Sequence, residues 1–222
     1  MKRLPALFIL LLALSSGLIH SQNPPDASAG SATFWQASLT AEINKDYDTA
    51  QSQLTAYQQA GGDPFLTNLR AGWLYCLKQD YPNAIKSYNE AEKLRPSAIN
   101  PLLGLLNVAQ AQGDAFSIQK AAGDVLRADP LNYRAQMADA AVEFTTKDYT
   151  QALAGYQRVL TYYPDDMTAL SGEAWCLYDL GDLHKAAADF QVLLGVNADY
   201  PYAKQGLALC QPKTAAAATT TN

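Results

Sequence analysis

Apolar residues recur at spacings of three and four along most of the chain. Leu102, Leu105, Leu106 and Ala109 follow the i, i+3, i+4, i+7 pattern, which places side chains on one face of an α-helix. The segment 118–126 shows the same pattern after a short polar break. The pattern predicts an all-α chain of short amphipathic helices, each of which buries one face.

Polar turns separate these segments at a constant interval. Each turn contains an aspartate that lies 34 residues after the previous one: Asp46, Asp80, Asp114, Asp148 and Asp182. An aspartate at a helix start accepts hydrogen bonds from unpaired backbone N–H groups, and its charge favours the positive end of the helix. We therefore expect each aspartate to cap the helix that follows it. Gln151 has the spacing of a reciprocal capping box with Asp148.

Prolines mark a second set of boundaries with the same period. Pro96, Pro130 and Pro164 are also 34 residues apart, and each follows a predicted helix. Proline lacks an N–H group and cannot continue the helical hydrogen-bond ladder, so these residues mark helix ends. Repetition at this period is typical of a solenoid built from helix–turn–helix units.

This unit resembles the tetratricopeptide repeat. Its best copy starts at Leu69, has Gly72 in the first helix and Ala84 and Tyr88 in the second, and ends at Pro96. Small residues recur at the Ala84 position and large ones at the Tyr88 position, namely Ala50, Ala152, Ala186, Leu54, Tyr156 and Phe190. The resemblance implies antiparallel helical hairpins stacked into a right-handed superhelical solenoid, with about five units and a C-terminal capping helix.

The third repeat departs from this pattern, because Ile118 and Ala122 stand where the family prefers alanine and a large aromatic residue. Asp139 and Glu173 occupy a position that the family usually fills with leucine, and Glu143 lies one turn after Asp139. Paired carboxylates can perform acid–base chemistry. No other catalytic group supports them here, so we expect ordinary solvated or paired acids and no enzyme activity.

The termini differ from the repeats. Lys2 and Arg3 precede an apolar stretch at 6–14 and small polar residues, which is typical of a secretory signal peptide at 1–21. The apolar stretch is shorter than the ~18 residues of a membrane span, so we expect no stable transmembrane anchor. The sequence predicts a linker at 22–31, a repeat domain at 32–211, a disordered Ala/Thr-rich tail at 212–222, and an exported protein that is periplasmic or secreted.

Charge and the reactive side chains exclude several functions. The chain has 16 basic and 21 acidic residues and no basic cluster, so we expect no nucleic-acid partner. Cys76, Cys176 and Cys210 have no metal-ligand spacing and are expected to be buried as small apolar residues. Beyond the predicted signal the one histidine is His184. We therefore predict no catalytic, metal or cofactor site. By repeat register Cys176 and Cys210 lie about 9–10 Å apart, too far for a disulfide.

The resemblance also implies a concave groove lined by the first helix of every repeat. By register the groove residues are Trp35, Leu39, Leu69, Trp73, Cys76, Leu103, Asn107, Gln110, Met137, Phe144, Trp175 and Tyr178, with Glu42, Ala141 and Ser171 in the same rows. Aromatic and methionine side chains with few charges are typical of a surface that anchors a peptide. The alternative is that the tryptophans pack between helices.

These features predict a scaffold or adaptor that binds another protein or a peptide segment in the groove. Some family members grip a C-terminal carboxylate with lysine and asparagine. Asn107 matches one such position, but Leu103 replaces the lysine and Arg134 alone does not restore the clamp. The alternatives are a carbohydrate-binding module, a non-catalytic subunit of an envelope enzyme assembly, and self-association through an end of the array.

Overall fold

The computed structural model describes residues 29–211, and the predicted signal peptide, most of the predicted linker and the predicted tail lie outside them. Within the described range the chain forms eleven α-helices and no strand. The helices are α1 (Ala29–Ile43), α2 (Tyr47–Gln59), α3 (Pro64–Leu77), α4 (Tyr81–Leu94), α5 (Ile99–Gln112), α6 (Ala115–Ala128), α7 (Tyr133–Thr145), α8 (Tyr149–Tyr162), α9 (Met167–Asp179), α10 (Leu183–Val196) and α11 (Ala203–Cys210). The first helix starts three residues ahead of the predicted repeat boundary at 32.

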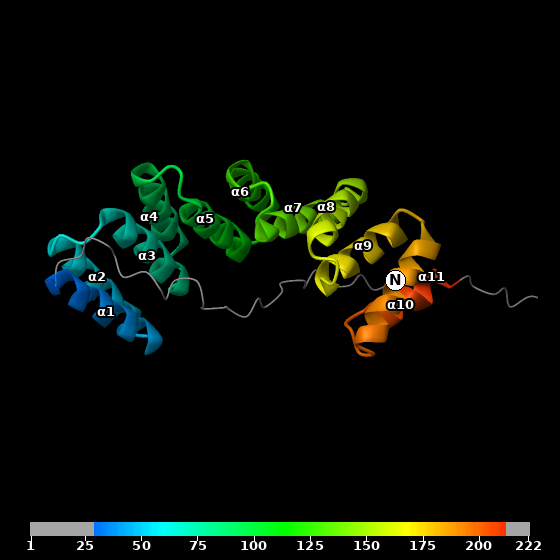
Figure 1. Ribbon diagram of the computed structural model, residues 1–222, viewed down its shortest axis with the longest axis horizontal. Coiled ribbons are helices and arrows are strands. Elements are labelled where there is room, and N and C mark those ends of the chain that lie inside the picture. Colours follow the sequence, from blue (N-terminus) through cyan, green and yellow to red (C-terminus); the bar gives the residue numbers. More distant parts are fainter. Residues whose placement is uncertain (1–28, 212–222) are drawn as a thin grey trace, which may run out of the picture.

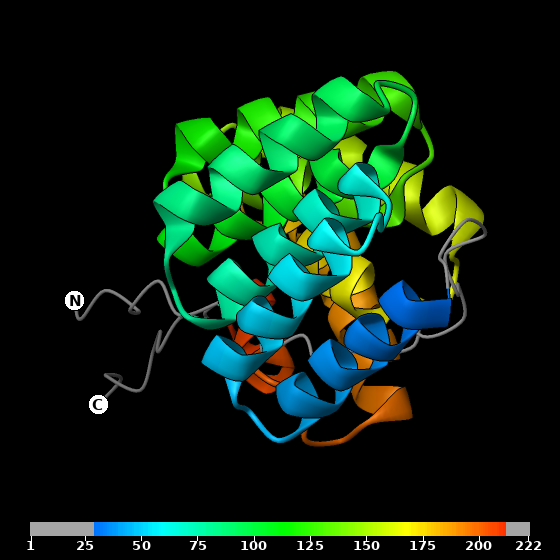
Figure 2. The ribbon, with the colours of Figure 1, turned by 90° about the vertical axis from the view of Figure 1, so that its left-hand side faces the viewer.

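The helices pack as five consecutive hairpins. Each odd-numbered helix from α1 to α9 packs against the even-numbered helix that follows it, and α11 packs against α9 and α10. In Figure 1 the helices α4, α6 and α8 follow the upper side of the array, and α3, α5 and α7 lie below them. Figure 2 looks along the array and shows the hairpins winding around a common axis, with the orange and red C-terminal helices behind the blue N-terminal ones. The predicted all-α solenoid of five hairpins and a capping helix is confirmed.

The turn inside each hairpin consists of one residue with positive φ followed by the capping aspartate. The positive-φ residues stand at the same repeat position: Lys45, Gln79, Gly113, Lys147 and Gly181. Each following aspartate accepts a hydrogen bond from the backbone N–H three residues later, so all five predicted caps are confirmed. The reciprocal half of the Asp148 capping box is not made, because the Asp148 N–H donates to the Glu143 carbonyl at 2.8 Å.

The second helices end where the prolines predict. The helices α4, α6 and α8 stop at Leu94, Ala128 and Tyr162, two residues before Pro96, Pro130 and Pro164. Of the helices that follow them, α7 and α9 have side-chain caps at Asn132 and Asp166, whereas α5 has Ala98 at its N-cap and no side-chain hydrogen bond there. Asp63 likewise caps α3. The helix boundaries therefore follow from local chemistry at each turn.

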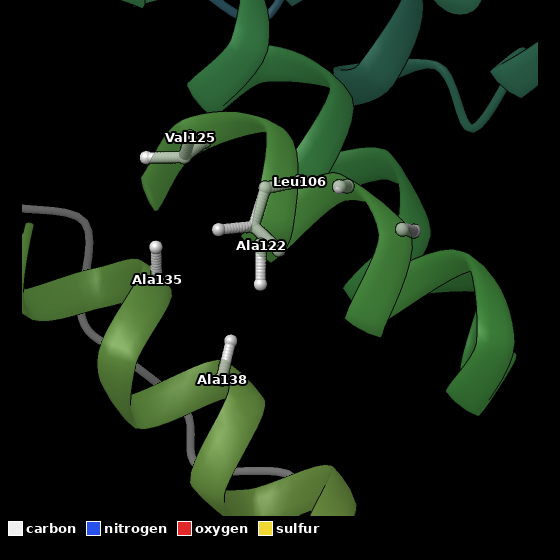
Figure 3. Packing of buried hydrophobic residues seen from close by; sticks show 7 residues of the cluster. Leu106, Ala122, Val125, Ala135 and Ala138 are labelled. Atoms are coloured by element: carbon white, nitrogen blue, oxygen red, sulfur yellow. The ribbon is translucent and has the colours of Figure 1, made fainter. Parts of the chain in front are cut away.

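Between successive hairpins, an aromatic ring of a second helix lies over a glycine of the next first helix. Tyr88 lies over Gly104, Tyr156 over Gly172 and Phe190 over Gly206, and a Cβ on any of these glycines would come within 3.0 Å of the ring. The junction of the third and fourth hairpins is different. There Ala122 and Val125 of α6 point toward Ala135 and Ala138 of α7, so methyl groups take the place of the ring (Figure 3).

Candidate functional site

The predicted groove residues lie on the odd-numbered helices, which form one continuous layer. The helices α3 and α5 are in contact, as are α7 and α9. Polar side-chain contacts join α1 to α3 and α5 to α7. We call the surface of this layer at the predicted positions the inner face. Its outlying members Gln110 and Ala141 are exposed, and most of the others are half-buried.

Two predicted groove residues are exceptions, because Ser171 is 3% exposed and Trp35 belongs to the core. The Trp35 side chain is 6% exposed. The Trp35 ring packs against the Tyr57 ring at a centroid distance of 5.1 Å. The guanidinium of Arg70, on α3, lies 5.5 Å from the centroid of the Trp35 ring. The prediction that Trp35 lines an open surface is therefore wrong, and the alternative of packing between helices holds for this residue.

Trp73 takes part in a polar network that joins the first hairpin to the second. Its indole N–H donates to Glu42 Oε1 at 2.7 Å. The other oxygen of Glu42 pairs with the Arg70 guanidinium at 2.7 Å. Arg70 also donates to Ser38 Oγ at 3.0 Å, and Ser38 donates to the Ala50 carbonyl at 2.8 Å. The hydrogen bond to Glu42 fixes the orientation of the Trp73 indole. The ring itself is half-buried and contributes to the inner face.

Sequence reasoning missed this network. Arg70 is 4% exposed, and it stands one repeat before Gly104, at a position that holds glycine or alanine in the later repeats. A charged residue at such a crowded position, with Glu42 on the first helix of the preceding hairpin, is the signal that would have found the network. Burial lowers the pKa of Arg70, while Glu42 opposes that shift.

The aromatic residues at the other end of the inner face are partly engaged with the core. Trp175 makes edge contacts with Tyr178 at 5.7 Å and with Phe190 at 5.1 Å between ring centroids. Phe144 packs against Tyr149 at 5.5 Å. The rings of Phe144, Trp175 and Tyr178 are half-buried, so each of them combines a fixed orientation with some accessible surface. Such pre-positioned rings suit contact with an apolar partner segment.

A polar site lies in the middle of the inner face. The Arg134 guanidinium, at the start of α7, donates a hydrogen bond to Asn107 Oδ1 on α5. Beside it the Tyr88 hydroxyl accepts a hydrogen bond from the Cys76 thiol at 3.9 Å. Burial raises the pKa of both Tyr88 and Cys76. Three of the predicted repeats therefore contribute to one cluster, of which sequence reasoning singled out Cys76 and Asn107.

The remaining inner-face residues lie on either side of this polar site. Leu39 packs against the core of the first hairpin, Leu69 against that of the second, and Leu103 against that of the third. Met137 packs against the core of the fourth hairpin. All four are half-buried, so the inner face is largely apolar around its polar centre.

Asp139, Glu143 and Glu173 have different neighbours. Glu173 accepts a hydrogen bond from Gln157 Nε2 at 2.8 Å, whereas Asp139 lies near Arg158 and Gln119. Burial, with the nearby charges of Asp139 and Asp148, raises the pKa of Glu143 to about 7. No group of three or more histidine, cysteine or acidic side chains between residues 29 and 211 is arranged to hold a metal ion.

The three cysteines differ in burial. Cys176 and Cys210 are buried and Cys76 is half-buried, and all three are free thiols. This confirms the expectation of small buried residues for Cys176 and Cys210. In the part of the chain that the structure describes, no helix is both long enough and apolar enough to cross a membrane.

The structure also contains a cleft that the sequence did not predict. It has a volume of about 500 Å³ and opens between α4, α5 and α6. Its lining residues are Asn89, Glu92, Leu102, Leu105, Lys120, Asp124, Arg127 and Ala128. Asp124 already pairs with Lys120 and Arg127, so the charges of this wall are largely mutually satisfied.

Stacked helical hairpins of constant length, closed by a capping helix, define the class of helical-repeat proteins. The family model for the tetratricopeptide repeat matches residues 144–204. The match covers about a quarter of the chain. Together with the five-hairpin fold, it supports the assignment of the chain as a tetratricopeptide repeat protein. Proteins of this class are generally non-catalytic binding scaffolds.

Related sequences are long proteins that match over part of their length. The chain is 28% identical over 123 residues to the Protein CTR9 homolog of Arabidopsis thaliana, covering 55% of this chain and 11% of the relative. It is 26% identical over 172 residues to the Hsp70-Hsp90 organizing protein of Triticum aestivum, covering 74% of this chain and 29% of the relative. The chain thus spans less than a third of the length of either relative.

Solved structures show the same fold. A tetratricopeptide repeat protein from Parabacteroides merdae has a TM-score of 0.71 at 15% identity, covering 82% of this chain and 73% of that one. MamA has a TM-score of 0.65 at 15% identity, covering 79% and 94%. YrrB, described as a tetratricopeptide repeat protein with an unusual peptide-binding site, has a TM-score of 0.59 at 19% identity, covering 65% and 74%.

Proposed function

We propose that this protein is an exported scaffold that holds a segment of another polypeptide against its inner face. The observation that carries the proposal is the row of half-buried apolar and aromatic side chains that the odd-numbered helices present together. Trp73, Phe144 and Trp175 come from three hairpins, and each ring is fixed by contacts on one side. A face of this kind gains affinity because little side-chain freedom is lost on binding.

The comparisons support a polypeptide ligand over a glycan. YrrB has the same fold and a peptide-binding site, and the chain itself carries tetratricopeptide repeats. A sugar-stacking platform needs open, coplanar ring faces. Here the rings of Trp175 and Tyr178 meet edge to face at an interplanar angle of 82°.

Export rests on the N-terminal residues of the sequence, which lie outside the described range. N-terminal sequencing of the protein purified from its own cells tests it. A mature chain that begins near residue 22 supports export, and a chain that retains Met1 in the cytosolic fraction contradicts it.

Site-specific photo-crosslinking in the native cells tests the binding proposal. The probe replaces Gln110, which is exposed on the inner face, and the control probe replaces Lys86, which is exposed on α4. We expect a discrete polypeptide adduct at Gln110 and none at Lys86. Adducts at Lys86 alone, or at neither position, would remove the inner face as the binding surface.

A further inference from the structure

The inner face contains one arginine that no acidic side chain neutralises. Three of the five arginines in the described range make ion pairs: Arg70, Arg95 and Arg127. Arg158 lies within electrostatic reach of Asp139 and Glu143. Arg134 has neutral neighbours instead, since its hydrogen bond goes to the amide oxygen of Asn107 and its electrostatic neighbour is Tyr88.

Arg134 is an exposed residue whose neighbours cover part of its side chain, and no counter-charge lies beside it. Burial lowers the pKa of Arg134, and the Tyr88 side chain is the group that opposes the shift. The chain has more acidic than basic residues, 21 against 16. Arg134 nevertheless has no acidic partner on the inner face. A partner carboxylate would supply the missing charge and accept the guanidinium N–H groups that Asn107 leaves unused.

The surroundings define the kind of segment that fits. Met137 lies one turn after Arg134 on α7, and Leu103 lies one turn before Asn107 on α5. Both are half-buried apolar residues of the inner face. The polar site is therefore bordered by apolar surface on both helices.

We propose that Arg134 binds an internal aspartate or glutamate side chain of the partner segment, whose flanking residues are apolar and contact Leu103 and Met137. The inference rests on the proposed function and deepens it. A chain-terminal carboxylate is the other source of the same charge. The structure favours the side chain, because Leu103 offers no second cation and the apolar border extends on both sides of Arg134.

Selection from displayed peptide libraries tests the proposal with the full chain. One library presents random 12-residue segments inside a rigid carrier loop, so that neither end is free, and a second presents the same length with a free C-terminus. The wild-type chain is compared with Arg134→Gln, Arg134→Glu and the control Lys86→Gln. Circular dichroism and thermal unfolding verify that each variant is folded.

We expect the wild-type chain and Lys86→Gln to enrich internal segments with one acidic residue between apolar ones. Arg134→Gln should weaken a selected peptide by up to about fivefold and remove the acidic preference. Arg134→Glu should select lysine or arginine at that position. Enrichment from the free-C-terminus library alone, or an acidic preference unchanged in Arg134→Gln, would overturn the proposal while leaving peptide binding intact. Failure of both libraries to yield an inner-face binder would overturn the proposed function as well.

Discussion

The ring of Tyr88 occupies the space that a side chain on Gly104 would need. A Cβ at Gly104 would lie within 3.0 Å of three ring carbons of Tyr88. The same ring also covers Gly72, where an added Cβ would lie 2.7 Å from the nearest ring carbon. The two glycines belong to successive first helices. One buried tyrosine therefore sets the separation between the second and third hairpins.

We predict that Gly104→Ala destabilises the protein by about 1–3 kcal/mol, because the added methyl group must displace a tightly packed ring. Urea denaturation followed by circular dichroism measures this change. Gly123→Ala is the matched control, since Gly123 lies inside α6 with nothing within 4 Å of the added Cβ. The control should be neutral or stabilising by up to about 1 kcal/mol, because alanine favours the helix. Equal losses in both variants would show that Tyr88 does not set this spacing.

Restoring the ring and the glycine at the junction of the third and fourth hairpins should couple the two positions. Leu106 stands where Gly72 does one repeat earlier and fills part of the space of the ring, so the prediction concerns the coupling between the two changes. Ala122 and Ala138 occupy the positions that hold Tyr88 and Gly104 one repeat earlier. We predict that each single change is neutral or destabilising. In Ala122→Tyr the new ring meets the methyl group of Ala138, and in Ala138→Gly the lost methyl group leaves a gap. The double variant should be more stable than the sum of the single changes by about 1 kcal/mol or more. A double-mutant cycle in urea measures the coupling, and additivity would refute the pairing.

The fold was predictable because its main signals are local. Each Asp cap and each terminating proline acts within one turn of helix, so the 34-residue spacing of Asp46 and its equivalents carried directly into the structure. The fate of Trp35 was not predictable in this way. Repeat register tells which side of a helix a residue occupies, but it does not tell which neighbours cover it, and here Tyr57 and Arg70 do. The link from Glu42 to Arg70 and Trp73 depends on contacts between hairpins. The sequence signals it only indirectly, by a charged residue at a position that holds glycine or alanine in the later repeats.

The hairpin turns contain removable backbone strain. Gln79 has a φ of 59°, whereas the equivalent positions in the third and fifth hairpins are Gly113 and Gly181. Because a residue with a Cβ pays for left-handed backbone, we predict that Gln79→Gly stabilises the protein by up to about 1 kcal/mol. Thermal unfolding measures the gain. Gln79→Ala is the control and should give no such gain, since alanine retains the Cβ. A stabilisation of equal size in the alanine variant would point to the loss of the glutamine side chain instead.

Stability should rise as the pH falls through the neutral range. The pKa of Glu143 is raised to about 7 by burial and by Asp139 and Asp148, from an ordinary value of 4.5. The pKa of Asp189 is raised to about 6 by burial and by Glu173 and Asp182. Between the ordinary and the raised values the folded state binds more protons than the unfolded state, so stability decreases with increasing pH in this window.

Urea denaturation at pH 5.5, 7 and 8 checks this dependence. We expect the wild-type chain to be most stable at pH 5.5, and Glu143→Gln to lose part of the dependence and to be the more stable of the two at pH 8. Glu90→Gln serves as the control, since Glu90 pairs with Lys93 on the surface. A Glu143→Gln profile parallel to that of the wild-type chain would contradict the assignment.

The ion pair between Arg70 and Glu42 should contribute far more than the pairs on the surface. Arg70 is 4% exposed, so replacing its partner leaves a buried guanidinium without a counter-charge. We predict that Glu42→Gln destabilises the protein by about 3 kcal/mol, at the lower end for a buried pair because the Glu42 side chain keeps 23% of its exposure. Asp48→Asn breaks the Lys78–Asp48 pair, which joins the same two hairpins through an Asp48 side chain that is 86% exposed, and should cost less than about 1 kcal/mol. Chemical denaturation of both variants gives the comparison, with Trp73 fluorescence as a second signal because its indole N–H donates to Glu42. If the two substitutions cost the same, Arg70 must find another partner or water in the folded state, and the network would not be what fixes the first hairpin on the second.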